Sequence, residues 1–510
     1  MKLKSLIAAA ASALLIASPL GAQGAQWTPE RVPDQTGIHI VDNFVSNGEQ
    51  ASRLTASVKH PGAKFPDERL CEEFDSGICD FTKNRPGGVL LLPACTAPTD
   101  ENCVAGLALT VGDNRIVSSF TEQLPGPKVK ADPARGLPEG STTSLWALPA
   151  ESGLAIKTYS VYAAIRVQGF ENGKFILDGL SVVVSPYTEI SGARYIEPRV
   201  EEFIQPNGRP TTSISGGELG CAWTANNRCG SLEDFDEDTR VEVEVRVTNK
   251  LGGWFRGRMQ APEVSVSKHS GTANVIKVSG ASVEVPMVYI SKPKDQIKPE
   301  LTKEIKRYNP GWQSTGIMNT RADYGMAIDF IKAGRTTVND TASGTVRVWN
   351  FSTVSAQGNP CLTDTSKVLG IVTTNSTAYQ GSAPSFNKGA LDYRLAGMHY
   401  LPDGETESLG SYDLVMRSEV ARCLYKFSKA PVSATISITG EGDKTIATTV
   451  VSEKGGWLKL AAYGFTFSEK TVKVKLTQGK QTTITCVAPG KKSKKVTAAN
   501  PKCPKGFRKR

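Results

Sequence analysis

Runs of alternating apolar and polar residues recur along the chain and predict β-strands. In residues 241–247 (VEVEVRV) valine alternates with charged side chains, so one face of a strand would be buried and the other hydrated. Residues 158–167 (TYSVYAAIRV) place their apolar side chains on one face in the same way. The same alternation occurs in residues 433–439 and 471–477.

Two further runs carry large apolar side chains on both faces and predict strands that are buried on both sides. They are residues 346–351 (VRVWNF) and residues 88–93 (GVLLLP). Helical patterns are few. Residues 299–308 (PELTKEIKRY) begin with Pro and Glu and end with Lys and Arg, which predicts a short helix, and residues 322–333 and 418–423 each allow a turn or two.

Proline-rich connections suggest how the chain is divided. Residues 198–210 contain three prolines, and residues 291–299 (SKPKDQIKP) resemble a linker. The predicted fold class is therefore mainly β, with tandem β-sandwich (immunoglobulin-like) domains crosslinked by disulfides and few short helices. The expected segments are an N-terminal β domain at 25–200, a second β-sandwich domain at 201–298, a C-terminal β-sandwich region at 299–478, and a basic tail at 479–510.

Residues 1–24 have the features of a secretory signal peptide. Lys2 and Lys4 precede an apolar run at residues 6–17, and small residues follow. The run has 12 residues, whereas a membrane-spanning helix needs about 20, so an uncleaved anchor is the less favoured alternative. No later run is apolar for long enough to span a bilayer. We expect a secreted or cell-envelope protein without a transmembrane anchor.

Ten cysteines in such a chain indicate disulfides. Their spacing suggests five pairs, although the first four cysteines can pair in three ways. A zinc site is disfavoured because there is no CxxC motif and only four histidines are present, so neither a metal nor a cofactor is expected. The suggested pairs are Cys71 with Cys79, Cys95 with Cys103, Cys221 with Cys229, Cys361 with Cys423, and Cys486 with Cys503.

The net charge of +10 is concentrated at the C-terminus. The last 20 residues hold nine Lys or Arg and no acid. Without these nine and the two lysines of the signal segment, 49 basic residues face 50 acidic ones. This balance argues against a nucleic-acid-binding face. The tail would instead be attracted to an anionic polymer or lipid headgroup, or would serve only to solubilise the chain.

No catalytic signature of a known type is present, and an enzyme is not expected. The chain lacks GxSxG, HExxH and P-loop motifs. The best local candidate is His399, which has Asp403 and Glu405 just downstream. However, Asp403-Gly404 is typical of a hairpin turn, so a packed strand histidine is the favoured interpretation of His399.

Asp234, Asp236 and Asp238 form a DxDxD pattern that invites comparison with a calcium loop. An EF-hand requires Gly at position six and Glu at position twelve, whereas this sequence has Thr239 and Val245. A hydrated acidic turn is the favoured interpretation.

The loop between Cys221 and Cys229 (CAWTANNRC) is the best candidate for ligand binding. Trp223, Asn226, Asn227 and Arg228 could stack on and hydrogen-bond a sugar or a peptide, and a disulfide would reduce the ordering cost. The favoured alternative is that Trp223 packs into a core and that the loop only carries a crosslink.

Several segments carry a resemblance to a known family. They are residues 359–361 (NPC), 370–375 (GIVTTN), 421–425 (ARCLY), 430–475, the closing segment 486–506, residues 95–103 and residues 253–258 (GWFRGR). These segments resemble a family of large, uncharacterised exported or cell-surface proteins of actinobacteria that has no assigned activity. The resemblance implies a secreted or cell-envelope setting and supplies no catalytic residues.

The leading hypothesis is a secreted or cell-surface structural or interaction protein. It would present disulfide-bonded loops to a cell-envelope polymer or glycan, or to another surface protein, and its basic tail would hold it to an anionic envelope. Adhesion fits this description. The alternatives are a carbohydrate-binding surface protein and an extracellular hydrolase with an unrecognised site near His399.

Overall fold

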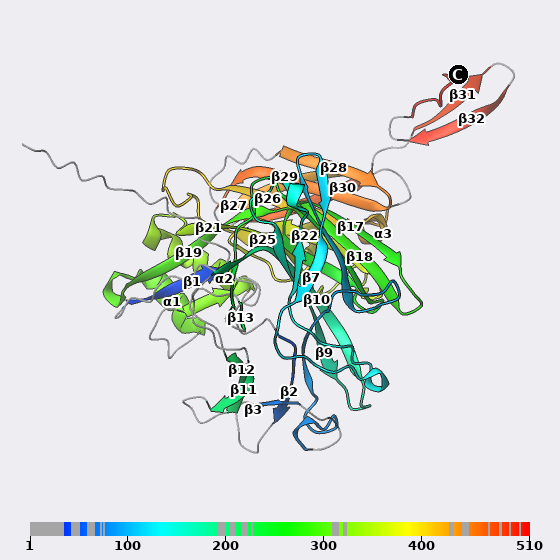
Figure 1. Cartoon of the computed structure of the whole chain (residues 1–510). Coiled ribbons are helices and arrows are strands. Elements are labelled where there is room, and N and C mark those ends of the chain that lie inside the picture. Colours follow the sequence, from blue (N-terminus) through cyan, green and yellow to red (C-terminus); the bar gives the residue numbers. More distant parts are fainter. Residues whose placement is uncertain are drawn as a thin grey trace, which may run out of the picture.

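The computed structural model describes residues 35–41, 51–58, 67–71, 74, 77–190, 199–204, 210–215, 223–225, 228–308, 316–319, 324–427, 432–440, 448–467, 470–478, 482–488, 491–498 and 501–510. The expected signal peptide at residues 1–24 lies outside them. Within the described residues the protein is mainly β with a few short helices (Figure 1), as the sequence predicts. No helix in this part of the chain is both long and apolar enough to cross a membrane.

A long sheet forms the centre of the body. In spatial order its main strands are β3 (Asp67–Leu70), β2 (Arg53–Val58), β4 (Gly87–Leu91), β9 (Thr158–Gly169), β10 (Phe175–Ile190), β21 (Gly344–Val354), β16 (Gly253–Arg258), β22 (Val368–Thr374), β26 (Leu409–Arg417), β29 (Trp457–Thr466) and β28 (Thr448–Lys454). Neighbours among these main strands are antiparallel except for β16 and β22, which are parallel.

Shorter branches extend this central sheet. They are β8 (Ser144–Ala147) with β7 (Ser119–Gln123) next to β9, β14 (Arg228–Leu232) with β13 (Trp223–Ala225) next to β10, and β19 (Val283–Pro293), β1 (Gln35–Val41) and β20 (Gly316–Asn319) next to β21. A separate hairpin is formed by β11 (Arg199–Ile204) and β12 (Pro210–Ser215).

A second sheet packs on one face of the central sheet, and its middle strand is the VEVEVRV run. The four valines of β15 (Arg240–Thr248) are buried at 0–1% exposure, and the charged residues between them lie on the outer face, where Glu242 pairs with Lys277 and Arg115. This strand is therefore predicted correctly. The strand order is β17 (Gln260–Lys268), β18 (Ala273–Ala281), β15 (Arg240–Thr248), β5 (Cys103–Val111) and β6 (Asn114–Val117).

A third sheet covers the opposite face of the central sheet at its β22–β26–β29 end. Residues of β26 show how the layers are arranged, since successive side chains of a strand point to opposite faces. Val415 belongs to the core shared with the second sheet, whereas Leu414 and Met416 belong to the core shared with the third. The third sheet consists of β23 (Ala378–Tyr379), β25 (Ala390–Ala396), β30 (Lys470–Gln478) and β27 (Val432–Gly440), with β24 (Ser385–Asn387) beside β25.

The three α-helices found among the described residues lie where the sequence predicts them. α1 (Pro299–Tyr308) and α2 (Tyr324–Gly334) pack together beside β1 and β19, and α3 (Ser418–Tyr425) follows β26 directly. The short 3₁₀ helices are η2 (Gly77–Cys79), η3 (Pro133–Arg135), η4 (Ala150–Ser152), η5 (Lys294–Gln296) and η6 (Arg335–Val338).

The sheets are not divided at the boundaries expected near residues 200 and 298. β5 pairs with β15, and β10 pairs with β21, so the segments 25–200, 201–298 and 299–478 share sheets instead of forming a row of separate sandwiches. One core contains residues of all three segments, including Leu107, Val243 and Trp349. Alternation along a strand indicates which side chains are buried, but it does not indicate which strand is the neighbour.

Four of the suggested disulfides are present: Cys71–Cys79, Cys95–Cys103, Cys361–Cys423 and Cys486–Cys503. The structure thus resolves the pairing of the first four cysteines. Cys229 is also disulfide-bonded, and Cys221, its expected partner, lies outside the described residues.

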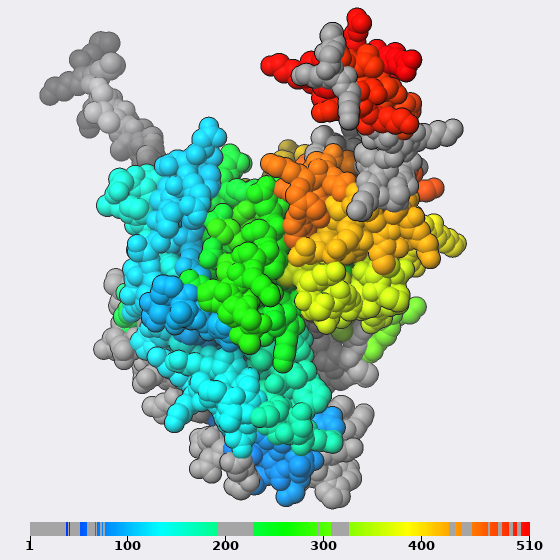
Figure 2. Space-filling view, turned by 90° about the vertical axis from the view of Figure 1, so that its right-hand side faces the viewer, coloured from blue at the N-terminus to red at the C-terminus, as the bar shows by residue number. Residues whose placement is uncertain are grey.

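The basic tail forms a small folded unit. β31 (Thr482–Ala488) pairs with β32 (Lys491–Ala498) and with β33 (Arg508–Lys509), and Cys486–Cys503 closes the sheet. We call this unit, residues 482–488, 491–498 and 501–510, the C-terminal module. It projects from the body in both Figure 1 and Figure 2.

Candidate functional site

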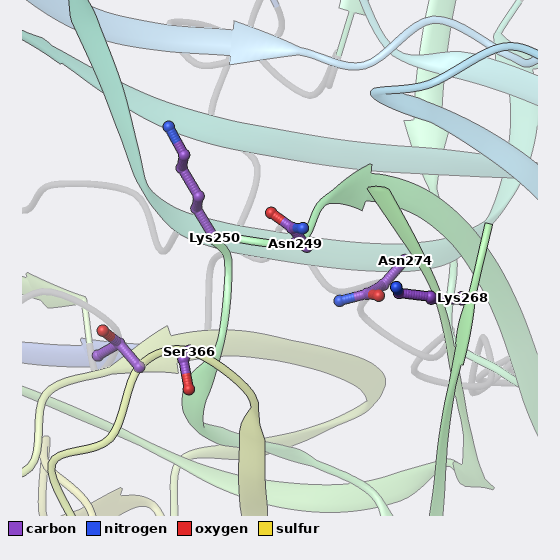
Figure 3. A pocket seen from close by; sticks show the side chains of 6 residues that line it. Asn249, Lys250, Lys268, Asn274 and Ser366 are labelled. Carbon is purple, nitrogen blue, oxygen red and sulfur yellow. The ribbon is translucent and has the colours of Figure 1, made fainter. Parts of the chain in front are cut away.

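Three connections meet around a polar surface pocket of about 510 Å³, shown in Figure 3. One is the β15–β16 turn, the second is the β17–β18 hairpin, and the third is the loop between β21 and β22. We call this the loop pocket. Its lining consists only of amide, hydroxyl and ammonium side chains: Asn249, Lys250, Lys268, Asn274, Thr365 and Ser366.

Two glycines allow the β15–β16 turn to lie against the loop before β22. A Cβ on Gly252 would lie 2.3 Å from the carbonyl oxygen of Thr365, so no larger residue fits without a backbone shift. Gly253 has φ +87° and donates its N–H to the Lys367 carbonyl at 2.7 Å. This close contact brings Asn249 and Lys250 next to Thr365 and Ser366.

The other side of the loop pocket is formed by the β17–β18 hairpin, where Lys268 and Asn274 are register partners and lie side by side in Figure 3. The Cys95–Cys103 loop supports this hairpin: Glu101 accepts hydrogen bonds from the hydroxyls of Ser270 and Thr272 near its tip. The Glu101 carboxylate thus holds one wall of the pocket in place.

Short-range hydrogen bonds and a disulfide constrain the loop that carries Thr365 and Ser366. The Asp364 carboxylate accepts from both the backbone N–H and the hydroxyl of Ser366, at 2.9 and 2.6 Å. Cys361 in the same loop is bonded to Cys423 of α3. The pocket wall is thus largely preorganised, which lowers the entropic cost of ligand binding.

The two lysines of the loop pocket give it its positive charge. Neighbouring lysines are neutralised, since Lys277 pairs with Glu242 and Glu244, and Lys367 pairs with Asp364 and Glu419. By contrast, Lys250 and Lys268 are exposed and form no ion pair within the described part of the chain. Two uncompensated cations beside amides and hydroxyls fit an anionic, hydroxyl-rich ligand.

The C-terminal module is a second charged surface. Seven of its basic side chains are exposed, and none forms an ion pair with a described residue. Lys494 also lies 5.1 Å from the centre of the Phe507 ring. The seven are Lys494, Lys495, Lys502, Lys505, Arg508, Lys509 and Arg510.

The predicted binding loop at Cys221–Cys229 is described only in part. Trp223 begins β13, and Asn226 and Asn227 lie outside the described residues. Arg228 hydrogen-bonds both Glu122 oxygens, at 2.8 and 3.1 Å, as well as Glu189. Its hydrogen bonds hold the pKa of the Glu122 carboxyl below its usual value. The guanidinium therefore joins this loop to β7 and β10, and ligand binding by the loop stays a prediction.

His399 is half-buried in a bend and is not part of a strand. Its Nδ1 lies 3.0 Å from the Phe467 carbonyl oxygen, and its Nε2 lies 3.6 Å from a Glu407 carboxylate oxygen. Asp403 instead accepts hydrogen bonds from the backbone of Glu405 and Thr406 within the turn. The structure thus does not bring His399 together with Asp403 and Glu405.

The three aspartates of the DxDxD segment differ in how far they are buried. Asp236 and Asp238 are exposed, as expected for an acidic turn. Asp234 is half-buried, and desolvation raises the pKa of its carboxyl to about 7, so the expectation of a hydrated turn is wrong at this position. In the chain as far as it is described, no three His, Cys, Asp or Glu side chains gather as a possible metal site.

The loop-pocket residues were not predicted from the sequence. They are common polar residues in three connections far apart along the chain, and no local motif unites them. The closest signal is the glycine pair Gly252-Gly253, which marks a close backbone approach but does not identify the partner. Comparison of the chain with models of known protein families, with curated proteins and with solved structures finds no match.

Proposed function

We propose that this chain is an exported interaction protein that binds an anionic polymer of the cell envelope through its C-terminal module and presents the body to a second partner. The observation that carries the proposal is the folded, disulfide-closed module with seven exposed cations that are not neutralised by a described carboxylate. Four disulfides and the signal-like N-terminus support export, as does the resemblance to exported actinobacterial proteins.

The fold of the module strengthens the electrostatic argument. A disordered basic tail would lose conformational entropy on binding, whereas a sheet closed by a disulfide has already lost most of it. Each basic residue close to an anionic surface contributes roughly 1 kcal/mol, so seven such residues give substantial affinity at low salt. The attraction is screened within about 10 Å at 0.1 M salt.

The test replaces charge without removing the module. Lys502, Lys505, Arg508, Lys509 and Arg510 are changed to Gln, which leaves Cys486 and Cys503 in place. Binding to immobilised polygalacturonate is then measured from low to high salt. We expect strong, salt-sensitive binding by the unmodified protein and little by the variant. The control carries five Gln substitutions on the body, at Lys83, Lys128, Lys130, Lys298 and Lys303.

Equal binding by both variants, or binding that salt does not weaken, would contradict the proposal. Vesicles containing anionic lipid form a separate arm of the experiment. If the protein binds these vesicles and does not bind the polysaccharide, the charged surface is confirmed but the polymer is the wrong partner.

The loop pocket supports a second candidate function, recognition of an acidic glycan. The supporting observation is that Lys250 and Lys268 face one polar pocket without a carboxylate partner among the described residues. An array of acidic and neutral oligosaccharides, probed with protein truncated after residue 478, tests this site separately from the C-terminal module. Changing both lysines to Gln should abolish binding to acidic members, and binding confined to neutral glycans would refute the assignment.

A further inference from the structure

A second cavity lies at the seam between the central sheet and the second sheet, at the opposite end of β17 from the loop pocket. Its volume is about 250 Å³, which suits a ligand smaller than a typical drug molecule. We call it the seam cavity. Its polar lining includes Arg240, Glu263, Asp413, Lys459 and Tyr463.

Strand register explains why these side chains meet. In the β26–β29 ladder Asp413 is opposite Ala461, Val415 is opposite Lys459, and Ser411 is opposite Tyr463. These residues share the face that is turned toward the second sheet, since Leu414 and Met416 point the other way into the core beneath the third sheet. Arg240 is the first residue of β15 and Glu263 is the fourth residue of β17, and both strands belong to the second sheet.

Asp413 is the central group of the seam cavity, although it is only 4% exposed. Its Oδ1 accepts a hydrogen bond from the Tyr463 hydroxyl at 2.5 Å, and its Oδ2 accepts one from the Ala261 backbone N–H at 3.3 Å. A buried carboxyl is disfavoured in its charged form unless it is well compensated. Lys459 does not neutralise it by direct pairing, because its ammonium lies 2.8 Å from a Glu263 oxygen.

The backbone beside Asp413 is strained. Ala261 has φ +49°, a left-handed conformation that is uncommon for a residue with a side chain, and it lies in an irregularity between Gln260 and Glu263 where β17 shifts register against β18. In this conformation its N–H points to Asp413 while its carbonyl accepts from Arg240 Nη2 at 3.1 Å. Strain that is retained at a cavity often reflects a functional requirement.

Arg240 retains free donors. Its Nη2 hydrogen-bonds Ala261 and Ser279, whereas Nε and Nη1 form no hydrogen bond with any described residue. A guanidinium that lines a small cavity and keeps unused N–H groups can donate charge-assisted hydrogen bonds to a carboxylate. We propose that the seam cavity binds the carboxylate of a monosaccharide-sized organic acid, held by Arg240 and Asp413.

The charges around Asp413 make this binding dependent on pH. Those facing it are Arg240 of β15, Glu263 of β17, and Lys459 and Tyr463 of β29, with Lys454 of β28 close to Glu263. Burial raises the pKa of the Asp413 carboxyl to about 7, while the hydrogen bond from Lys459 keeps the pKa of Glu263 low. Protonated Asp413 can donate to the ligand, whereas ionised Asp413 repels it.

Titration calorimetry with galacturonate tests the proposal, with galactose as the neutral ligand of the same ring size. The acid form of Asp413 is about tenfold more abundant at pH 6 than at pH 8, so we expect a comparable ratio of affinities. Galactose should not bind. Asp413→Asn, a neutral isostere, should bind galacturonate equally at both pH values, and Arg240→Gln should lose binding. Arg115→Gln on the same sheet is the matched control.

Three results would overturn the proposal: no heat of binding from folded wild-type protein, equal affinity at pH 6 and pH 8, or unchanged binding by Arg240→Gln. If Asp413→Asn does not fold, Tyr463→Phe replaces it. Removing the hydroxyl that stabilises ionised Asp413 should extend galacturonate binding to higher pH.

Discussion

The guanidinium carbon of Arg258 lies 4.3 Å from the centre of the Tyr379 ring, and both side chains are almost completely buried. Arg258 also donates to the carbonyl oxygens of Thr374 and Thr377, each at 3.1 Å, and to that of Ser376. Arg256, two residues earlier on β16, lies 5.1 Å from the same ring. The GWFRGR segment, noted for its resemblance, thus forms a buried cation–aromatic cluster that joins the central and third sheets.

Replacing Arg258 with Met should be strongly destabilising. The three carbonyls would lose a charged donor in a site that water does not reach, and we expect a loss of about 3 kcal/mol or more in the free energy of unfolding, measured with urea. Arg258→Lys keeps the charge but not the planar fork, so its free energy of unfolding should lie between those of the unmodified protein and of Arg258→Met. Arg115→Met, on the exposed face of β6, is the control and should change stability by less than about 0.5 kcal/mol. A loss of that small size for Arg258→Met would show that the cluster is not important for stability.

Stability should decrease as the pH rises from about 4 to about 7. Burial raises the pKa values of Asp413 and Asp234 to about 7 in the folded protein, compared with about 3.9 in an unfolded chain. Between these values the folded state binds more protons than the unfolded state, so raising the pH favours unfolding, and above pH 7 the effect is complete. Asp413→Asn should flatten part of this slope and stabilise the protein at pH 8 by up to about 4 kcal/mol. Thermal melts across pH 4–8 measure the slope, and an unchanged slope in this variant would argue against the assignment.

The Cys361–Cys423 disulfide should contribute more stability than the short-loop disulfides. It joins residues 62 positions apart, whereas Cys95 and Cys103 are separated by 8. On the chain-entropy model, replacing both cysteines of a disulfide by Ser should lower the free energy of unfolding by roughly 4 kcal/mol for the long loop and by roughly 2–3 kcal/mol for the short loop. Denaturant unfolding of the two double variants compares them. A larger loss for the short loop would show that native contacts outweigh chain entropy here.

The loop pocket should be sensitive to a single methyl group at its base. Gly252→Ala would place a Cβ against the Thr365 carbonyl and separate the turn from the loop before β22. We expect lower thermal stability and weaker binding of acidic oligosaccharides. Gly271→Ala, where a Cβ meets nothing within 4 Å, is the matched control. Equal behaviour of the two variants would mean that the close contact is dispensable.

Local features of the fold were predictable because their causes are local. The alternation in β15, the helix signals at residues 299–308 and the cysteine spacings each depend on neighbouring residues. The pairing of β5 with β15 and the meeting of Asp413 with Arg240 depend on how distant segments dock, which alternation does not specify. Asp413 lies in the run SYDLVM, where a single acid among apolar residues is the only sign of a buried carboxyl.

The ladder between β10 and β21 has a consequence for how the body is assembled. Leu180 donates its backbone N–H to the hydroxyl of Thr353, 173 positions later in the chain. A nascent polypeptide that ends before β21 would leave the edge of β10 without this neighbour, and an open edge of that kind invites pairing with other chains. Folding dominated by such distant pairings is slow, so β10 stays exposed to wrong pairing until β21 has been synthesised and has docked.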